Sequence, residues 1–497
     1  MVLTKKIKRI HFVGIGGAGV SALANLMLEM GYEVSGSDLL CSAVTEGLKR
    51  KGAIIFEGHD ARHVHRANLV ITSTAIPESN VEIVTAKQLS IPVLTRTDFL
   101  SYLSQRKFSI SVSGSHGKST TCAMISVIFY YADLDPTIVL GAQVKHLFGS
   151  SRLGRSEYFV CEGDESNNSM LRFSPTIAVV TNVDDDHLDF HGSLENLKQS
   201  FLNFLDNATE NGTCVYNLDD PILAELGTKL TRPKKITYGI SSEATIRAQA
   251  IKILKNGTRF KVFKGKDKEL GEVRLRIPGI YNVRNALGAI AVSDFCGIDF
   301  GSVAFGLENF PGISRRYEKL IDRDDLTIID DYAHHPSEIA ELLSAVRATT
   351  SRRIRVVFQP HRYTRSQRLA AKFPPAFQAC DEVILTEIYS AFEPPIDGVT
   401  TEYLYSFFEH EYSQAKAKLM LRRDEILSYL KETAQYGDII MTVGAGDIYQ
   451  LGYELQGYFK DRRLGDKPKP KLKQSCSPSS ERKLGSFDSG KAIYKGD

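Results

Sequence analysis

The segment from Gly114 to Thr120, GSHGKST, has the composition of a loop that binds the phosphate groups of a nucleotide. In such loops the backbone N–H groups surround the phosphates, the lysine reaches the β- and γ-phosphates, and the hydroxyl that follows can ligate Mg²⁺. The usual pattern G-x-x-x-x-G-K-S would place its first glycine at the position of Val112, so this loop is a shorter variant. A strand-like run precedes it and a helical run follows it, which favours phosphate binding over an ordinary helix N-terminus.

A second glycine-rich segment, GIGGAG at positions 14–19, contains the pattern G-x-G-x-x-G between a strand-like run and a helical run. Glycines at these positions permit a tight turn and let the backbone approach a diphosphate at the positive end of the helix. Asp38 follows about 20 residues later, where a carboxylate that binds a ribose hydroxyl is expected. The segment therefore predicts a nucleotide diphosphate site, but it does not distinguish NAD from a UDP-sugar.

Two acidic segments, CEGDES at 161–166 and NVDDDHLD at 182–189, each follow a strand-like run in the same part of the chain as the GSHGKST loop. Carboxylates at the carboxyl ends of parallel strands, beside a phosphate-binding loop, are typical of Mg²⁺ sites with oxygen ligands. Three adjacent aspartates cannot all face one ion, so we expect some of them to face solvent. The two segments predict a metal site next to the nucleotide phosphates.

These motifs lie within an α/β pattern that begins three times along the chain. The first unit has strand-like runs at 7–13, 33–36, 53–56, 69–72 and 91–94, and a helical run at 19–30. The second has a strand, loop and helix at 108–132, strand-like runs at 158–162, 176–182 and 213–217, and a segment at 243–277 that suggests antiparallel strands. The third has strand-like runs at 326–333, 353–359, 382–388 and 438–444. The alternation predicts parallel, doubly wound sheets.

Length and composition fit this organisation. At about 100–200 residues per domain, a chain of 497 residues suggests three domains. Its net charge of +3 gives no indication of nucleic-acid binding. Residues 461–497 hold ten Lys/Arg and five Asp/Glu and are rich in proline and serine, so we expect a disordered basic tail there.

The cellular location can also be inferred from composition. The seven cysteines are scattered without a Cys-x-x-Cys pair, which indicates reduced thiols rather than disulfides or a zinc site. No run approaches 18 apolar residues, so no membrane insertion is expected. The apolar stretch near the N-terminus ends at once in glycines, which predicts a first strand rather than a signal peptide. We therefore expect a cytoplasmic protein.

Taken together, the shortened GSHGKST loop, the E-x-D-E-S motif and the DDDHLD motif resemble those of the Mur ligases of peptidoglycan synthesis. The third unit resembles the branch of this family that joins L-alanine to UDP-N-acetylmuramate. The motifs that carry this second resemblance are FPGISRRYE at 310–318, DDYAHHP at 330–336, FQPHRYTR at 358–365 and GAGDI at 444–448. The resemblance extends over residues 7–460.

The resemblance implies an α/β protein with three domains and a tail. These are a Rossmann-like UDP-sugar domain (1–107), a central ATP-binding domain with a mixed sheet (108–314), a C-terminal Rossmann-like amino-acid domain (315–460) and the tail (461–497). It implies a reaction of ATP, L-alanine and UDP-N-acetylmuramate with Mg²⁺, through an acyl phosphate that the alanine amine attacks. It also implies a monomer or a homodimer.

The resemblance further implies roles for individual residues. Catalytic roles are implied for Lys118, His187, Tyr332, His334, Arg362 and Arg365. Nucleotide binding is implied for Gly114, Ser115, His116, Gly117, Lys118, Ser119, Thr120, Asn282, Asn285, Arg316 and Asp331. Substrate binding is implied for Gly14, Gly16, Gly17, Gly19, Asp38, Ser73, Arg362 and Arg365. Metal binding is implied for Ser119, Glu162 and His187.

Three positions depart from the family pattern: Tyr281 replaces the usual His, Asn167 the usual Asp, and Phe392 the usual Gly. Alternative functions stay open at this point. One is the related ligase that recycles muropeptides by adding a tripeptide, although FQPHRYTR favours the alanine-adding branch. Folylpolyglutamate synthases lack the UDP-sugar domain. An NAD-dependent oxidoreductase would leave the second loop and the acidic segments unexplained, and a non-catalytic scaffold would not need Lys118 and Glu162.

Overall fold

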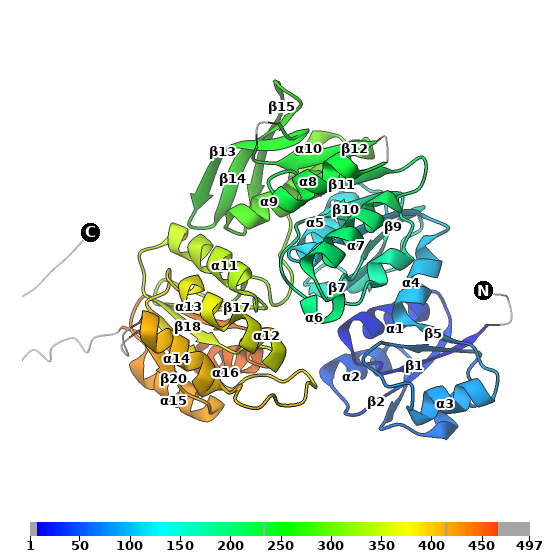
Figure 1. Cartoon of the computed structure of the whole chain (residues 1–497), viewed down its shortest axis with the longest axis horizontal. Helices are drawn as coiled ribbons and strands as arrows, with labels where there is room; N and C mark the ends of the chain where they lie inside the picture. The colour runs from blue at the N-terminus through cyan, green and yellow to red at the C-terminus, as the bar shows by residue number, and fades with distance from the viewer. Residues whose placement is uncertain (1–6, 232–233, 242, 413–415, 466–497) are drawn as a thin grey trace, which may run out of the picture.

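The computed structural model describes residues 7–231, 234–241, 243–412 and 416–465, and it divides into three lobes that follow one another along the chain (Figure 1). Each lobe is built on its own β-sheet, and the strands of one sheet are consecutive in sequence. The α/β class and the three-unit organisation predicted from the sequence are confirmed. Most of the predicted tail, from residue 466 on, lies outside the described residues.

The first lobe is a five-stranded, fully parallel sheet with the order β3-β2-β1-β4-β5. Its β-branched central strands are buried because helices cover both faces, as expected of parallel sheets. The strands are β1 (Arg9–Val13), β2 (Glu33–Asp38), β3 (Ile54–Glu57), β4 (Leu69–Thr72) and β5 (Val93–Thr95). The helices are α1 (Ala18–Glu29), α2 (Ala43–Arg50), η1 (Ala61–Val64), α3 (Val81–Gln88) and α4 (Arg96–Ser104).

The second lobe contains a ten-stranded mixed sheet with the order β15-β14-β13-β12-β11-β10-β6-β9-β7-β8. Its strands are β6 (Phe108–Ser113), β7 (Thr137–Val144), β8 (Gly149–Arg152), β9 (Tyr158–Glu162), β10 (Ile177–Val180), β11 (Thr213–Asn217), β12 (Lys235–Gly239), β13 (Ile246–Leu254), β14 (Gly257–Lys264) and β15 (Lys268–Leu275). Its helices are α5 (Lys118–Tyr131), η2 (Ser169–Arg172), α6 (Leu188–His191), α7 (Leu194–Asp206), α8 (Pro221–Lys229), α9 (Ile280–Phe295) and α10 (Phe300–Glu308). The sequence pattern did not single out β7, β8 or β12.

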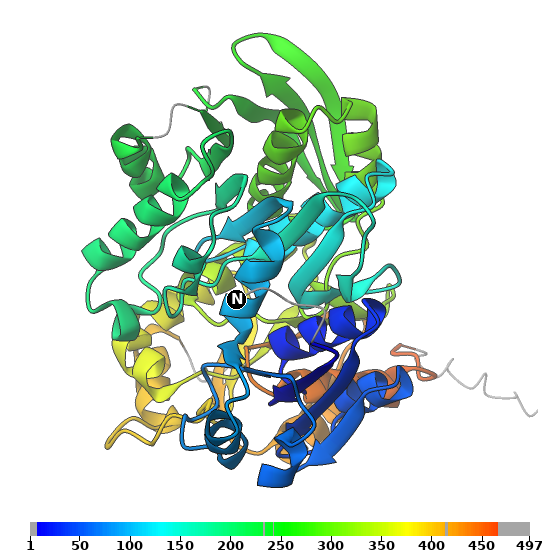
Figure 2. The same ribbon diagram turned by 90° about the vertical axis from the view of Figure 1, so that its right-hand side faces the viewer.

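The antiparallel part of this sheet is confined to its two edges. Strands β13, β14 and β15 pair antiparallel, as predicted for residues 243–277, and β8 pairs antiparallel with β7 at the other edge. Figure 2 shows the green strands of β13 to β15 at the end of the molecule farthest from the blue first lobe. The opposite edge, at β8, lies against the first lobe, where Asn25 Nδ2 of α1 donates to Ser151 Oγ at 3.0 Å.

The third lobe is a six-stranded sheet with the order β16-β17-β21-β18-β19-β20, in which only β16 is antiparallel. Its strands are β16 (Glu318–Asp322), β17 (Leu326–Asp331), β18 (Ile354–Phe358), β19 (Glu382–Leu385), β20 (Ala417–Leu419) and β21 (Asp438–Val443). Its helices are α11 (Pro336–Thr349), α12 (Tyr363–Leu369), η3 (Ala370–Lys372), α13 (Phe373–Ala376), α14 (Thr401–Glu411), α15 (Arg423–Thr433) and α16 (Tyr449–Phe459). None of the helices in the described ranges has the length and apolar character needed to span a membrane.

A buried carboxylate holds the first lobe together on one side of its sheet. Glu82 of α3 is fully buried and accepts a hydrogen bond from Ser37 Oγ at 2.5 Å. The rings of His59 and His63 place Nδ1 at 3.1 and 2.7 Å from its two oxygens. Although burial opposes ionisation, hydrogen bonds from His11 and Ser37 lower the pKa of Glu82 to about 2. The carboxylate is thus ionised in the folded protein at neutral pH.

We expect Glu82→Gln to lower the free energy of unfolding at pH 7 by about 1–3 kcal/mol, because it removes a charge that buried donors are arranged to receive. The folded pKa lies below the unfolded value of about 4.3, so this contribution is complete above that value and is lost as the pH falls toward 2. Denaturant unfolding at pH 7 and pH 3 measures the difference.

The matched control is Glu78→Gln, at an exposed carboxylate that pairs with Lys87 on the surface. Exposed ion pairs contribute about 0–1 kcal/mol, so this variant should unfold like the unaltered protein. Equal stability of the two variants at pH 7 would contradict the role assigned to Glu82.

Candidate active site

The phosphate loop lies between β6 and α5, at the carboxyl edge of the central sheet. Gly117 has a φ of 80° and ends the loop, and α5 begins at Lys118. The ammonium of Lys118 donates hydrogen bonds to the carbonyl oxygens of Gly114 at 2.6 Å and Ser115 at 3.1 Å. It also donates to Glu165 Oε1 at 2.7 Å. Although burial opposes the charge, Glu165 raises the pKa of Lys118, so the lysine stays protonated.

Both glycines of this loop are required by close packing. A Cβ atom at Gly114 would lie 2.1 Å from Thr181 Oγ1, and one at Gly117 would lie 2.4 Å from Asn285 Oδ1. Asn285 comes from α9, so Gly117 is the point at which this helix touches the loop. Asn285, which is predicted to bind the nucleotide, therefore contacts the predicted phosphate loop directly.

We expect Gly117→Ala to reduce kcat/KM for ATP by about 100-fold, the loss typical of a displacement of about 1 Å in a positioned group. The new methyl group would push the loop away from Asn285, and the positive φ adds strain. Steady-state kinetics with varied ATP measures the effect.

Gly297→Ala is the control, because Gly297 has a similar φ of 73° but no heavy atom within 4 Å of the added Cβ. It carries the backbone strain without the clash, so its melting temperature should fall while kcat/KM for ATP is retained. A similar kinetic loss in both variants would assign the effect to strain alone.

Of the three predicted Mg²⁺ ligands, Ser119 and Glu162 contact each other and His187 lies nearby. Ser119 Oγ donates to Glu162 Oε2 at 2.9 Å, and Glu162 Oε1 accepts from the Gly141 N–H at 2.7 Å. His187 lies at the end of the adjacent loop with Nε2 at 3.7 Å from Glu165 Oε1. A hydroxyl and a carboxylate next to the phosphate loop are the oxygen ligands that Mg²⁺ prefers, so the residues fit this ion. Glu165 Oε2 is buried without a hydrogen-bond partner, which leaves a further acceptor at this place.

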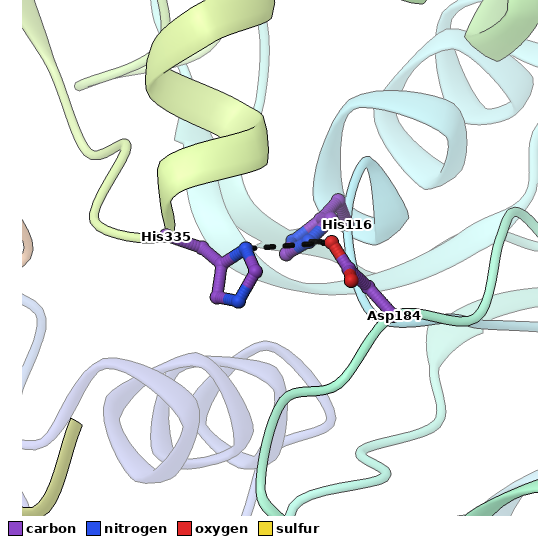
Figure 3. Close-up of side chains that lie close together, drawn as sticks. All are labelled: His116, Asp184 and His335. Atoms are coloured by element: carbon purple, nitrogen blue, oxygen red, sulfur yellow. Dashed lines mark hydrogen bonds and ion pairs between the residues drawn. The ribbon is translucent and has the colours of Figure 1, made fainter. Parts of the chain in front are cut away.

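Another cluster of metal-ligand residue types, His116, Asp184 and His335, joins the loop to the third lobe (Figure 3). His116 Nε2 lies 3.0 Å from Asp184 Oδ2, and His335 Nδ1 lies 3.3 Å from the same oxygen. On its other side, His116 Nδ1 lies 3.3 Å from Glu338 Oε1. Although burial opposes protonation, Glu338 and Asp184 raise the pKa of His116 to about 10. The cluster therefore links the phosphate loop and the DDD segment to the third lobe.

A cavity of about 360 Å³ lies beside this link, between the second and third lobes. Seven of the predicted nucleotide-binding residues line it: His116, Gly117, Thr120, Asn282, Asn285, Arg316 and Asp331. The other four, Gly114, Ser115, Lys118 and Ser119, belong to the same loop but are not among its lining residues. Tyr281 also lines the cavity, and burial raises the pKa of its hydroxyl well above the ordinary value, so it is a neutral donor.

Several lining residues of this cavity were missed at the sequence level. They are Asn217, Asp219, Asp220, Tyr238, Arg284, Glu338 and Glu341. A signal for three of them existed, because Asn217 ends the strand-like run at 213–217 and Asp219 and Asp220 come just after it, at the sheet edge that carries the loop. Arg284, Glu338 and Glu341 come from helices of different lobes and have no comparable local signal.

Asp331 and Arg316 reach this cavity from the third lobe, but both already have protein partners. Asp331 accepts hydrogen bonds from the N–H groups of Tyr317 at 2.6 Å and Ala333 at 2.8 Å. Burial raises the pKa of Asp331 to about 6. Arg316 Nη1 donates to Glu338 Oε1 at 3.2 Å. Asp331 therefore ties the backbone at Tyr317 to the backbone at Ala333, and Arg316 places a positive charge at the cavity wall.

The DDD segment of the central lobe is held by cations of the third lobe. Arg365 Nη2 donates to Asp186 Oδ1 at 2.8 Å, and both side chains are about 5% exposed. Lys372 Nζ donates to Asp185 Oδ2 at 2.7 Å, and Arg368 donates to the Asp185 carbonyl oxygen at 2.7 Å. We expected some of the three aspartates to face solvent, and Asp184 and Asp185 are partly exposed, whereas Asp186 is buried. All three have partners among the described residues. Their charge is neutralised by the facing lobe.

A second cavity, of about 400 Å³, lies where Arg362 and Arg365 face the central lobe. Its lining residues are Asp186, Leu188, Asp189, Gly192, Arg362, Thr364, Arg365 and Arg368. Arg362 is half-buried, with Nη1 at 3.7 Å from Asp189 and 3.6 Å from Glu393. Neither distance is a strong hydrogen bond, so the Arg362 guanidinium is free to bind another carboxylate.

Tyr332 and His334 lie close together beside these arginines. Their rings are 5.6 Å apart, and His334 Nδ1 lies 3.1 Å from the Tyr332 carbonyl oxygen. Burial and the charge of Arg365 lower the pKa of His334 well below its ordinary value, so the ring is neutral. The guanidinium carbons of Arg315 and Arg316 lie 4.8 and 5.1 Å from the centre of the Tyr332 ring. The residues that are predicted to bind the amino-acid substrate therefore lie close together.

The first glycine loop lies apart from both cavities, in the first lobe. The N–H of Gly16 donates to Asp38 Oδ2 at 2.8 Å, so the predicted loop and the predicted carboxylate are in contact. Ser73 lies in the loop after β4, where its Oγ accepts from the Ala75 N–H at 3.3 Å. The neighbouring Thr74 accepts from Asn167 Nδ2 at 3.2 Å, which brings this loop against the E-x-D-E-S segment. The first and second predicted sites therefore face each other.

Comparison with known proteins accounts for all three lobes. Family models match residues 9–108 (Mur ligase family, catalytic domain), 112–293 (Mur ligase middle domain) and 315–446 (Mur ligase, glutamate ligase domain). The UDP-N-acetylmuramate--L-alanine ligase of Dictyoglomus turgidum is 43% identical over 90% of this chain and 96% of that protein. The crystal structure of UDP-N-acetylmuramate-alanine ligase MurC from Thermotoga maritima superposes with a TM-score of 0.78 at 29% identity, over 91% of this chain and 99% of that one.

A more distant structure shares the fold. The murein peptide ligase of Psychrobacter arcticus superposes with a TM-score of 0.68 at 24% identity, over 90% of this chain and 98% of that one. At this identity the likeness concerns the arrangement of the three lobes and carries no argument about the acceptor.

Proposed function

The chain belongs to the Mur ligase family, and we propose that it joins L-alanine to UDP-N-acetylmuramate with the hydrolysis of ATP to ADP and phosphate. The observation that carries the proposal is the convergence of the GSHGKST loop, the acidic segments and the arginines of α12 at the junction of two lobes. The proteins that share these features over nearly their whole length are named for this reaction.

The reaction has two steps, and each one forms one bond and breaks one bond. A carboxylate oxygen of the sugar acid attacks the γ-phosphorus of ATP, the bond from that phosphorus to the bridging oxygen breaks, and ADP leaves. The amine of alanine then attacks the acyl carbon, the bond to the phosphate oxygen breaks, and inorganic phosphate leaves with loss of the amine proton. Each step needs charge on phosphate oxygens to be stabilised, which positioned cations supply.

The residues of this chain have separate parts in these steps. Lys118 would move from its loop carbonyls and Glu165 toward the transferring phosphoryl group. Ser119, Glu162 and His187 would hold Mg²⁺, which neutralises phosphate charge when it is bound. In the third lobe, Arg362 and Arg365 would bind the amino-acid carboxylate, because a planar guanidinium forms two parallel bonds with a carboxylate. The neutral ring of His334 can accept a hydrogen bond from the amino group.

ADP release by the purified protein tests the proposal, with ATP, Mg²⁺ and UDP-N-acetylmuramate against a panel of single amino acids and the recycling tripeptide. We expect release that depends on both L-alanine and the sugar nucleotide. Release only with the tripeptide would transfer the assignment to the recycling ligase, and release with no acceptor would refute a ligase. The cytoplasmic location and the oligomeric state stay predictions.

A further inference from the structure

Glu338 lies between the nucleotide cavity and the residues that are predicted to bind the amino acid. It is in the first turn of α11, and its side chain is only 8% exposed. Its Oε1 atom lies 3.3 Å from His116 Nδ1 and accepts a hydrogen bond from Arg316 Nη1 at 3.2 Å. Its Oε2 atom accepts from the His334 N–H at 3.1 Å and lies 3.4 Å from His334 Nδ1. One carboxylate therefore contacts the phosphate loop with one oxygen and His334 with the other.

The Oε1 side of this carboxylate is held by two cations. His116 is fixed within the phosphate loop, where its N–H donates to Asn182 Oδ1 at 2.8 Å and its carbonyl oxygen accepts from Thr181 Oγ1 at 2.5 Å. Although burial opposes ionisation, the charges of His116 and Arg316 hold the pKa of Glu338 well below its ordinary value. Glu338 is thus an anion whose position is set by the phosphate loop.

The Oε2 side determines which nitrogen of His334 carries the proton. The ring is neutral, so one nitrogen has a proton and the other has a lone pair. Nδ1 faces two acceptors, the Tyr332 carbonyl oxygen at 3.1 Å and Glu338 Oε2 at 3.4 Å. The proton therefore belongs on Nδ1, because the partner of one ring nitrogen sets the tautomer. Nε2 is left with the lone pair, which can accept a hydrogen bond from an amino group.

We propose that Glu338 is a positioning residue for amide formation: anchored by the phosphate loop, it holds His334 with Nε2 free for the amino group of L-alanine. This inference rests on the proposed function and adds a residue that the sequence prediction did not include. Glu338 acts through His334 and does not touch the reacting atoms. The same loop holds Lys118 through two of its carbonyl oxygens, so the groups that serve the two steps share one support.

Glu338→Gln keeps the size of the side chain but replaces one acceptor with a donor. Its oxygen should face His116 and Arg316, because both are charged donors, and its NH₂ group would then face the N–H and Nδ1 of His334. A donor there opposes a proton on Nδ1, so Nε2 loses its lone pair. We expect kcat/KM for L-alanine to fall by about 10- to 150-fold, the loss of one charge-assisted hydrogen bond. Glu338→Asp keeps both acceptors on a shorter side chain and should recover part of this loss.

Hydroxylamine in place of L-alanine separates this role from a structural one. It is a small nucleophile that is uncharged at neutral pH, and it traps an acyl phosphate as the hydroxamate without using the amino-acid site. With ATP, Mg²⁺ and UDP-N-acetylmuramate, Glu338→Gln should form the hydroxamate at the rate of the unaltered protein. An equal loss with hydroxylamine and with L-alanine would overturn the proposal, because the effect would then lie in phosphoryl transfer or in the fold. Unchanged kcat/KM for L-alanine would overturn it as well.

The control is Glu425→Gln, at a glutamate in the first turn of α15, another helix of the third lobe. Its carboxylate is 53% exposed and lies 3.6 Å from Arg422, so this variant should keep both reactions. If Glu338→Gln fails to fold, ¹⁵N NMR of the histidine rings in the unaltered protein decides, with His334→Gln used to assign the signal. We expect the proton of His334 on Nδ1, and a proton on Nε2 would overturn the proposal.

Failure of the proposed function would be seen separately. An unaltered protein that forms the hydroxamate but accepts only another amino acid or the recycling tripeptide would refute L-alanine as the acceptor, and Glu338→Gln would then be measured with that acceptor. An unaltered protein that forms no hydroxamate and releases no ADP would refute the ligase reaction, and the tautomer of His334 would still test the contact with Glu338.

Discussion

Replacing Lys118 with alanine is expected to lower kcat by about 10²- to 10³-fold, the loss typical of removing one positioned donor from a charged transition state. The ammonium is half-buried, protonated and bonded to two loop carbonyls and Glu165, so its charge is held at the end of the phosphate loop. The other cation of the loop, His116, is paired with Asp184 and Glu338 and so does not take this place. Single-turnover measurement of ADP formation reports the chemical step directly.

Lys235→Ala is the matched control for Lys118→Ala. Lys235 also donates to two main-chain carbonyl oxygens, of Gly227 at 3.1 Å and Leu230 at 2.9 Å, but on β12 away from the loop. It should keep its kcat, whereas UDP binding should be intact in both variants because the first lobe is untouched. A Lys118→Ala protein with normal turnover would remove the lysine from the mechanism.

The parts of the site that the sequence predicts well are those built by consecutive residues. Glycines at 114 and 117 adopt positive φ between a buried strand and a helix, and Ser119 lies in the first turn of that helix next to Glu162 of the neighbouring strand. Strand neighbours and helix N-termini follow from local pattern and from the handedness of βαβ units. Most strands of the three sheets were found in the same way, whereas β7, β8, β12, β16 and β20 were not.

The parts that the sequence does not predict are contacts between lobes. His116 binds Glu338 and Lys372 binds Asp185, pairs that are 187 residues or more apart in the chain. From the sequence alone, charged residues of this kind are predicted to be exposed to solvent, because no periodic pattern indicates which residue of another lobe they contact. The cavity beside His116 is likewise a property of the junction, because each lobe supplies only one of its walls.

One departure from the family pattern has a physical explanation in the backbone. Phe392 has a φ of 67° and Ala391 a φ of 50°, both in the left-handed region that favours glycine. The Phe392 ring is 92% exposed, so no packing contact offsets the strain. Glu393, the next residue, accepts from Thr364 Oγ1 at 2.8 Å and thereby holds this turn beside Arg362. The usual glycine at this position would adopt the same turn without strain.

The second large effect is expected when an arginine that binds the amino-acid carboxylate is removed. We expect Arg362→Ala to raise the KM for L-alanine by about 10- to 150-fold, because a charge-assisted hydrogen bond contributes about 1.5–3 kcal/mol. Its own partners lie at 3.6 and 3.7 Å, so little protein structure depends on it and kcat should change less. Steady-state kinetics with varied L-alanine measures the shift.

Arg365→Ala should differ in kind, because it removes the partner of a buried carboxylate. Asp186 would be left in the junction without its hydrogen bond at 2.8 Å, next to His187, so kcat should fall together with the rise in KM. Arg422→Ala, at an exposed arginine paired with Asp424, serves as control and should leave both constants unchanged. If neither Arg362→Ala nor Arg365→Ala alters the KM for L-alanine, the carboxylate must be bound elsewhere. If Arg365→Ala alters KM alone, its pairing with Asp186 does not position His187 for the transfer step.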